Sequence, residues 1–411
     1  MTLVKATRRR AARLPAVAGL PAALMLLALG ACALPPKKSI QPAAPVTAAA
    51  PAPAPVPAPA QAAPGTLPAE PTPFDLERVD IRGFIEEVSA EHGIPAAEIR
   101  ALLAQGMFQP RIIAAITRPA ESVLKWWQYS ERLVSAERIA RGVEFARQQA
   151  PRLAAAETAT GVPAAYIAAI IGIETSYGRN KGSWRVLDAL MTLGFDYPPR
   201  SRFFRAELAH FLLLAREESL DPLAVRGSYA GAMGAPQFMP SSYRRYAVNG
   251  SLDGAGNRRR DLFDDWDDVI GSVANYFVAH GWQRGAPVLL DVAADPAIFA
   301  ALMPTLNPRN LQLDETAAGA RARGLPLPAA IADDTRLILL PAELADRPNV
   351  RVGLQNFHVI TRYNRSILYA MAVHDLATAI AAASVVTPVT PAAPAATPAA
   401  TPPLVDGVPA T

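Results

Sequence analysis

The sequence predicts an α+β fold that is predominantly α-helical. Over residues 74–150 the apolar residues recur three and four positions apart, which is the spacing of helices buried on one face. Short apolar runs typical of strands come only later, at 288–290 and 337–340. The chain between its two Pro/Ala-rich ends, about 310 residues long, is enough for a large core with one or two smaller modules.

The first 31 residues have the pattern of a secretory signal. An Arg-rich stretch is followed by a mostly apolar one that ends at Leu29, and Gly30 and Ala31 supply the small residues before a cleavage site. Cys32, the only cysteine, follows directly. The segment resembles a lipoprotein signal peptide with its lipobox, which implies that Cys32 is lipidated and anchors the protein to a membrane. A plain signal peptide beside a free thiol is the alternative.

Two stretches are too poor in varied apolar residues to bury a core. Residues 32–73, rich in Pro and Ala, are interpreted as a tether, and residues 384–411, rich in Pro, Ala and Thr, as a disordered tail. By analogy with lipoprotein sorting, Ala33 after the cysteine favours the periplasm, at the inner face of the outer membrane. The tether would let the folded part reach away from that surface.

The charge balance excludes one class of partner. The formal net charge of +4 is small for 411 residues, and much of it lies ahead of the first apolar stretch. A protein that binds nucleic acid keeps a strong basic surplus in its folded part. We therefore expect no nucleic-acid partner.

The folded part divides into two regions in chain order. Residues 74–150 form a helical subdomain, and residues 151–383 form the core that carries the chemistry. Within this core we expect a loop from 151 and then helices at 164–173, 201–216 and 267–280, with a Gly-rich loop at 226–238 between the last two. An irregular insertion follows at 286–350, with short β-runs and a helical pattern at 310–323. The last helix lies within 366–382.

Glu174 is the residue best suited to chemistry. It follows ten residues without a charge, Ala164–Ile173, whose apolar character on every side predicts a buried helix. A glutamate in the last turn of such a helix meets both desolvation and the negative end of the helix dipole, and both raise its pKa. A carboxylic acid that stays protonated near neutral pH can protonate a glycosidic oxygen. The residues alone leave open a salt bridge with Arg179 or Lys181, or a side chain in solvent.

The loop from Gly227 to Pro240 supports the catalytic interpretation. Its sequence, GSYAGAMGAPQFMP, combines glycines that allow close backbone approach with side chains that bond to or stack on sugars. Such a loop suits a polysaccharide better than a small metabolite. A tight structural turn is the alternative.

Four separated motifs give the chain a specific resemblance. IETSYG at 173–178, GSYAGAMGAPQFMPSSY from 227, SVANYF at 272–277 and TRYN at 361–364 resemble the membrane-bound lytic murein transglycosylase B family over about residues 74–382. The resemblance implies a lysozyme-like catalytic core with added helical elements. It also implies cleavage of the β-1,4 bond between N-acetylmuramic acid and N-acetylglucosamine in peptidoglycan without water, leaving a 1,6-anhydro end, and no required cofactor.

The resemblance also assigns residues. Glu174 matches the catalytic acid, and the positions that match the lining of the glycan groove are Ser228, Gln237, Phe238, Tyr276, Tyr363, Asn364 and Tyr369. Ordinary glycosidases use two carboxylates, but the nearest acids in sequence, Glu157 and Asp188, lie in unlike settings. One acid is enough if the C6 hydroxyl of the substrate is the nucleophile. Enzymes of wall synthesis are partners by family analogy.

The family's calcium loop is altered in this chain. Residues 249–268 keep the alternating oxygen ligands of an EF-hand-like loop, which would bind a structural Ca²⁺ through Asn249, Ser251, Asp253 and Asp268. Asn replaces Asp at the first position, and three arginines follow at 258–260. A polar surface loop without metal is the alternative.

Two other functions stay open at this point. The chain could be a peptidoglycan-binding lipoprotein that organises wall enzymes without cutting, although a pure binder has no need of a buried acid. It could also be a hydrolytic muramidase of the same fold. The mass of the released products separates transglycosylase from hydrolase.

Overall fold

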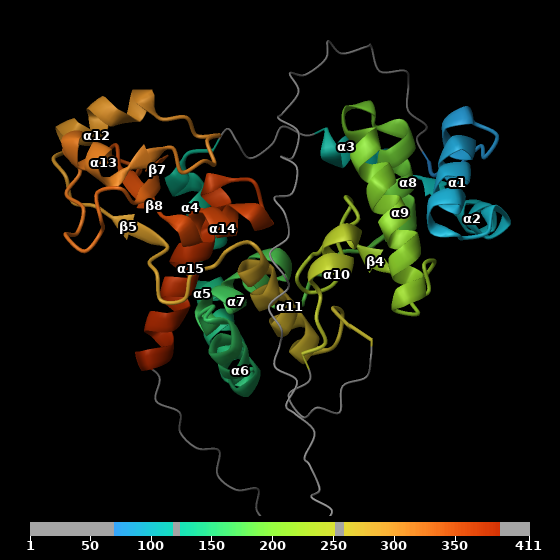
Figure 1. The fold of residues 1–411 in the computed structure, drawn as a ribbon, viewed down its shortest axis with the longest axis horizontal. Coiled ribbons are helices and arrows are strands. Elements are labelled where there is room, and N and C mark those ends of the chain that lie inside the picture. The colour runs from blue at the N-terminus through green and yellow to red at the C-terminus, as the bar shows by residue number, and fades with distance from the viewer. Residues whose placement is uncertain (1–69, 118–123, 251–258, 387–411) are drawn as a thin grey trace, which may run out of the picture. The chain divides into compact units, whose positions relative to one another are not determined.

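The computed structural model describes residues 70–117, 124–250 and 259–386, all within the compact unit Pro53–Thr411 (Figure 1). The signal segment with Cys32, most of the tether and the tail from residue 387 lie outside the described residues. The helices of the described part are α1 (Val79–His92), α2 (Ala96–Leu103), α3 (Pro110–Ile116), α4 (Trp126–Leu133), α5 (Ala136–Gln148), α6 (Ala150–Thr160), α7 (Ala164–Thr175), α8 (Val186–Asp196), η2 (Pro198–Arg200), α9 (Ser201–Glu217), α10 (Pro240–Tyr246), α11 (Trp266–Ala279), α12 (Pro296–Leu302), η3 (Met303–Thr305), α13 (Ala317–Ala322), α14 (Gln355–Tyr363) and α15 (Ile367–Val386).

The strands are few and short. β1 (Thr72–Pro73) pairs with β2 (Met107–Phe108), and β3 (Trp184–Arg185) pairs with β4 (Arg226–Gly227). The remaining four strands form one antiparallel sheet in the order β5-β8-β7-β6. Their bounds are β5 (Leu289–Asp291), β6 (Glu315–Thr316), β7 (Arg336–Pro341) and β8 (Val350–Gly353). The fold is thus a predominantly α-helical α+β fold, as the sequence predicts.

The four-stranded sheet separates two apolar cores. Side chains alternate between the faces of a strand, so Ile338 and Leu340 of β7 join the large core of the helices, while Leu337 and Leu339 join a second core under α12 and α13. The register pairs Leu339 with Val352 of β8. The sheet therefore attaches the section from β5 to β8 to the helical body.

Helix α7 lies at the centre of the helical body. Every residue from Ile167 to Ile171 is fully buried, because α7 packs against α5, α6, α11 and α15. Its uniformly apolar sequence, which predicted burial on most faces, has no polar stripe that could face solvent. The core thus holds α7, whose last turn contains Glu174, in a fixed position.

Two predicted segments differ in the structure. Residues 151–160, expected in a loop, belong to α6, because Pro151 lies in the first turn, where its missing N–H costs nothing, and alanines follow. Of the helical pattern at 310–323 only α13 is helical: Thr316 caps it by accepting a hydrogen bond from the Gly319 N–H, and β6 precedes it. Leu311 and Leu313 pack on the large core instead.

The ends of the described part extend slightly beyond the predicted boundaries. Thr72 and Pro73, which the sequence placed in the tether, pair with β2. Helix α15 continues to Val386, beyond the predicted start of the tail at 384. By length and hydropathy the segment Ile367–Val385 could cross a membrane, but half of it is buried in the protein, as in the core helix of a globular domain.

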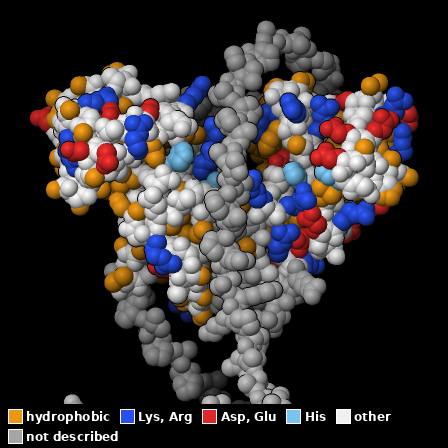
Figure 2. Space-filling view, viewed as in Figure 1, with side chains coloured by type: hydrophobic (Ala, Val, Ile, Leu, Met, Phe, Trp, Pro, Cys, Tyr) orange, Lys and Arg blue, Asp and Glu red, His pale blue; other side chains and the backbone are white. Residues whose placement is uncertain are grey.

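Acidic and basic side chains are mixed on the face that Figure 2 displays. Many charges form ion pairs, among them Arg147 with Glu144 and Arg216 with Glu98. This mixture corresponds to the small net charge of the chain.

Candidate active site

Glu174 lies in the last turn of α7, as predicted. The helix ends at Thr175, and the next three residues, Ser176, Tyr177 and Gly178, have left-handed backbone conformations with φ of 51°, 62° and 80°. Two consecutive non-glycine residues with positive φ are strained, and such strain persists only where the surroundings enforce it. The chain therefore turns sharply at the acid.

The Glu174 carboxyl group is held by one tyrosine. The Tyr369 hydroxyl, on α15, donates a hydrogen bond of 2.5 Å to Oε1 of Glu174. The Glu174 side chain keeps some access to solvent, yet burial raises its pKa from 4.5 to about 7, and the hydrogen bond from Tyr369 opposes this rise. At neutral pH a large fraction of this carboxyl group is therefore protonated and able to donate a proton.

The salt bridge considered from sequence does not form. The Lys181 ammonium pairs with Asp264 at 3.0 Å, and Arg179 is exposed. The shift in the pKa of Glu174 has only two causes, burial and the Tyr369 bond. An apolar setting without a compensating cation is what keeps a carboxylic acid neutral.

Tyr363 and Tyr369 stay protonated beside the acid. Burial raises the pKa of each well above its usual value, and the charge of Glu174 adds to the effect. Tyr363, the last residue of α14, donates its hydroxyl hydrogen to the Pro236 carbonyl at 2.6 Å. Both side chains are therefore hydrogen-bond donors across the working pH range.

The rings of Phe238 and Tyr276 pack against the ring of Tyr363. The ring centroid of Tyr276 lies 4.8 Å from that of Tyr363 and 5.5 Å from that of Phe238, and Phe238 and Tyr363 are 5.8 Å apart. Phe238 is only 2% exposed and Tyr276 only 7%. Among these three rings, Tyr363 is the one with partial access to solvent.

Gln237 connects the Gly-rich loop to the turn after α7. Its backbone φ is 53°, and its amide nitrogen donates to the carbonyls of Lys181 at 3.1 Å and Gly234 at 2.9 Å. This geometry fixes the amide plane. The carbonyl oxygen of the Gln237 side chain has no hydrogen-bond donor among the described residues, so it can accept one from a ligand.

Ser228 and Asn364 are two predicted lining residues for which the structure gives no side-chain contact with Glu174 or Tyr363. The Ser228 hydroxyl accepts hydrogen bonds from the N–H groups of Ala230 and Ala232, so it shapes its own loop. Asn364 directly follows α14, and its side chain is exposed. Asn364 is the next residue after Tyr363, and Ser228 lies in the Gly-rich loop that also carries Phe238.

Thr175 is a site residue that sequence reasoning missed. It is 1% exposed, and its hydroxyl donates to the Ala235 carbonyl at 2.8 Å while accepting the Gly178 N–H at 2.9 Å. One side chain thus joins the end of α7, the left-handed turn and the Gly-rich loop. The available signal was a single small polar residue directly after the acid in an otherwise apolar helix.

The helical subdomain also reaches the site. Tyr129, on α4, lies close enough to Tyr369 to influence the pKa of its hydroxyl. Arg141, on α5, donates to the Ser176 hydroxyl at 3.2 Å, and Tyr177 donates to the Arg138 carbonyl at 2.8 Å. These contacts hold the turn after Glu174 from a second side.

The two acids nearest Glu174 in sequence, Asp188 and Glu157, are both engaged in structural contacts. Asp188 is 5% exposed, pairs with Arg185, and accepts the Met107 N–H at 2.9 Å. Glu157 accepts the Ala164 N–H at 3.0 Å, at the opposite end of α7 from Glu174. Both carboxylates therefore have structural partners.

Only part of the predicted calcium loop is described. Ser251 and Asp253 lie outside the described residues. Asp268 is 1% exposed, and its oxygens accept hydrogen bonds from the N–H groups of Gly250 at 2.7 Å and Asp261 at 2.6 Å. The side-chain amide of Asn249 donates a hydrogen bond to the Arg259 carbonyl at 3.1 Å. Asp268 thus ties the two ends of the loop together. Within the described ranges no three His, Cys, Asp or Glu side chains are grouped as a metal site.

Comparisons with known proteins agree on one family. The model of the transglycosylase SLT domain matches residues 77–378. Membrane-bound lytic murein transglycosylase B of Escherichia coli K12 is 38% identical over 313 residues, which are 74% of this chain and 82% of that protein. The structure of lytic transglycosylase SltB1 from Pseudomonas aeruginosa is 45% identical and covers 74% of this chain and 97% of its own, with a TM-score of 0.68.

Solved structures of similar proteins contain ligands. The Escherichia coli lytic transglycosylase Slt35, 37% identical with a TM-score of 0.67 over 76% of this chain and 96% of its own, was solved in complex with bulgecin A. It was also solved in complex with calcium. SltB3 from Pseudomonas aeruginosa, 27% identical over 74% of this chain and 79% of its own with a TM-score of 0.63, was solved with NAG-NAM-pentapeptide.

Proposed function

The chain belongs to the transglycosylase SLT domain family, and on that premise we propose that Glu174 alone performs both proton transfers of a non-hydrolytic cleavage. The protein is a lysozyme-like lytic transglycosylase that cleaves peptidoglycan, and this chemistry needs no cofactor. A non-catalytic scaffold is therefore set aside. The proposal concerns the route of cleavage, namely which residue moves the proton and what replaces water.

In the first step the neutral Glu174 acid gives its proton to the glycosidic oxygen between N-acetylmuramic acid and N-acetylglucosamine. The single observation that carries this step is the half-buried carboxyl group with a pKa of about 7. Oε1 accepts the Tyr369 hydrogen bond, and Oε2 has no hydrogen-bond partner among the described residues. Oε2 is therefore the oxygen that carries the proton to the substrate. The Tyr369 bond then stabilises the carboxylate that remains.

In the second step the carboxylate takes a proton back. The C6 hydroxyl of N-acetylmuramic acid attacks the anomeric carbon, and Glu174 removes the hydroxyl proton as the 1,6-anhydro ring closes. Glu174 thereby returns to its protonated form, so that the proton balance closes without water. The reaction is intramolecular, which makes the held geometry of the sugar the main requirement.

The lack of a second carboxylate supports this route. Inverting and retaining glycosidases place two carboxyl groups beside the scissile bond. Here Asp188 is tied to Arg185, and Glu157 to the Ala164 N–H. A nucleophile supplied by the substrate needs neither of them.

We assign the glycan groove to the residues around the acid. Ser228, Gln237, Tyr363 and Asn364 contact the strand, while Phe238 and Tyr276 hold the Tyr363 ring and Tyr369 holds the acid. The partial exposure of Tyr363 and the unused carbonyl oxygen of Gln237 support this assignment. The complex of SltB3 with NAG-NAM-pentapeptide supports a strand with its peptide stem as the substrate.

Digestion of purified sacculi separates the two cleavage routes. We expect products that end in anhydro-muramic acid, about 18 Da lighter than the reducing ends that a hydrolase releases by adding water. Glu174→Gln should release no soluble product, while Glu157→Gln, the matched control on the neighbouring helix, should release the same products as the parent. Reducing ends from the parent would make the protein a hydrolytic muramidase.

For location, we propose a periplasmic enzyme anchored through lipidated Cys32, at the inner face of the outer membrane. The membrane-bound relative supports membrane association. Cys32 lies outside the described residues, and the proposal rests on its place after the signal segment. Calcium at residues 249–268 stays a prediction, supported by the calcium complex of Slt35.

A further inference from the structure

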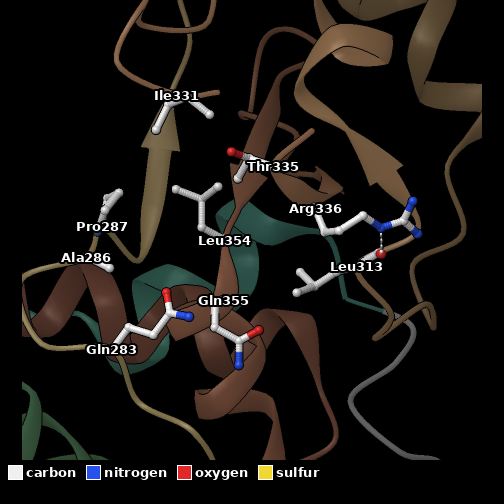
Figure 3. A pocket seen from close by; sticks show the side chains of 9 residues that line it. All are labelled: Gln283, Ala286, Pro287, Leu313, Ile331, Thr335, Arg336, Leu354 and Gln355. Carbon is white, nitrogen blue, oxygen red and sulfur yellow. Dashed lines mark hydrogen bonds between the residues drawn. The ribbon is translucent and has the colours of Figure 1, made fainter. Parts of the chain in front are cut away.

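A pocket of about 270 Å³ lies at the junction of the β-sheet section and the helical body (Figure 3). Its walls come from the segment after α11, from the region before β7, and from the start of α14. None of its lining residues is among those assigned to the glycan groove. Its volume is close to the lower end of small-ligand sites.

A buried asparagine holds one wall of this pocket in shape. Asn356 is fully buried, and its amide nitrogen donates to the carbonyls of Gln283 at 2.8 Å and Ala286 at 2.9 Å. Its amide oxygen accepts the Gln283 N–H at 2.7 Å. The wall formed by Gln283, Ala286 and Pro287 is therefore preorganised by the helix that carries Tyr363.

Neutral polar groups line the pocket between apolar walls. Figure 3 shows the side chains of Gln283 and Gln355 at the same end, next to Leu354. Within the described residues the side-chain amide of Gln283 and the Thr335 hydroxyl have no hydrogen-bond partner. The side-chain amide of Gln355 makes only one long hydrogen bond, of 3.5 Å, to the Gly281 carbonyl. Two amides can together donate and accept hydrogen bonds.

The one charged lining residue turns away from the pocket. The Arg336 guanidinium donates from Nε to the Leu313 carbonyl at 3.0 Å, and Figure 3 shows its end directed away from Gln283 and Gln355. A carboxylate ligand would need a cation inside the pocket. The lining therefore favours an uncharged ligand that has both an amide and a small apolar group.

We propose that this pocket binds the acetamido group of an N-acetylated sugar in a glycan strand, as a second contact outside the active site. The acetamido methyl group would lie against Leu354 and Ile331, and its N–H and C=O would bond to Gln283 and Gln355. The inference goes beyond the proposed function and rests only on peptidoglycan being the substrate. A peptide stem, which also contains amides, carries carboxylates that the neutral lining does not match.

Helix α14 gives this second contact a defined distance from the active site. Gln355 begins the helix and Tyr363 ends it, eight residues later. At about 1.5 Å per residue the two lie roughly 12 Å apart along the axis. A glycan strand that occupies both the pocket and the active site would be held at each end of α14. Its affinity would therefore depend on the length of the strand.

Methyl NMR on the full chain carrying Glu174→Gln tests the proposal. The probe is the tetramer of N-acetylglucosamine, and the matched control sugar is cellotetraose, which has the same linkage without acetamido groups. We expect a saturable shift of the Ile331 methyl signal with the first sugar only. Replacing both Gln283 and Gln355 by Ala should weaken that binding about tenfold, because both hydrogen bonds to the acetamido group are lost. Gln312→Ala, an exposed glutamine of the same section, should leave it unchanged.

Three outcomes would overturn the proposal. Equal shifts with cellotetraose would remove the role of the acetamido group, and unchanged affinity in the double variant would remove the glutamines. A shift of Ile331 with free stem tetrapeptide, but not with the sugar, would assign the pocket to the peptide. The product masses from sacculi test the cleavage route independently of this result.

Discussion

The hydroxyl of Tyr369 on α15 donates a 2.5 Å hydrogen bond to Oε1 of Glu174 on α7, across 195 positions of sequence. The two helices pack directly against each other. This bond favours the ionised carboxylate, while burial favours the neutral acid, and burial has the larger effect on the pKa. The site can therefore hold either form, which the proposed double role of Glu174 as acid and then base requires.

Activity should fall as the pH rises through about 7. The first step needs the protonated acid, and the pKa of Glu174 is raised from 4.5 to about 7, so the active form is lost on the alkaline side. In Tyr369→Phe the bond that lowers this pKa is absent, so the alkaline limb should move to higher pH. The rate should fall about tenfold or more, because a hydrogen bond to a charged group contributes about 1.5–3 kcal/mol.

The pH–rate profiles of parent and variant on soluble glycan strands check this prediction. Tyr246→Phe is a suitable control, because the Tyr246 hydroxyl contacts His280 rather than the acid. An alkaline limb that stays in place or moves to lower pH in Tyr369→Phe would contradict the assigned role of the hydrogen bond.

Glu174→Gln should stabilise the fold at alkaline pH. The folded-state pKa of about 7 lies above the unfolded value of 4.5, so the carboxyl group contributes no penalty below pH 4.5 and a growing one as the pH rises through 7. At 1.36 kcal/mol per pH unit the full penalty is about 3 kcal/mol. Urea unfolding should show a more stable variant at pH 8 and little difference at pH 4. The same difference at both pH values would show that the acid is not desolvated.

Thr175 should act as a positioning residue. Thr175→Val leaves the Gly178 N–H and the Ala235 carbonyl without their partner, and each buried unsatisfied group costs about 1–3 kcal/mol. We expect lower stability and a lower kcat with little change in KM, because the turn beside the acid loosens. Thr175→Ser keeps the hydroxyl and should restore both. If the serine variant behaves like the valine variant, the hydrogen bonds are not the cause.

Asp188 should matter for stability and not for chemistry. Removing one partner of the buried Asp188–Arg185 pair costs about 3 kcal/mol, so Asp188→Asn should lower the midpoint of urea unfolding. Its pH–rate profile, measured on the folded variant, should keep the shape of the parent profile. A lost or shifted limb would show that Asp188 takes part in proton transfer and that the single-acid route is wrong.

The local parts of the site were predictable from sequence. The apolar run Ala164–Ile173 predicted both the buried helix and the raised pKa of Glu174, because burial and helix position follow from neighbours in the chain. The resemblance placed Tyr369 in the site, although no local pattern could show that its hydroxyl meets Glu174. Thr175 and Tyr129 were missed because their roles depend on contacts between separate elements.

One error in the fold has a local reason and the other depends on tertiary packing. A loop was expected from residue 151, but Pro151 lies in the first turn of α6, where it interrupts no hydrogen bond. The pattern at 310–323 resembled one helix, but Leu311 and Leu313 belong to the large core and α13 begins only after Thr316. The conformation of this segment depends on which of the two cores each apolar side chain joins, and a single window of sequence contains no information about this choice.

Titration of the Glu174 carboxyl group tests most directly whether the enzyme holds this acid protonated at neutral pH. Carbon-13 NMR of the chain with labelled glutamate side chains, assigned by comparison with Glu174→Gln, would follow this one carboxyl group across pH 3–9. We expect a midpoint near 7, raised by burial from the ordinary value of 4.5. A midpoint for Glu174 near 4.5 or below would contradict the claim that the enzyme holds its acid protonated at neutral pH.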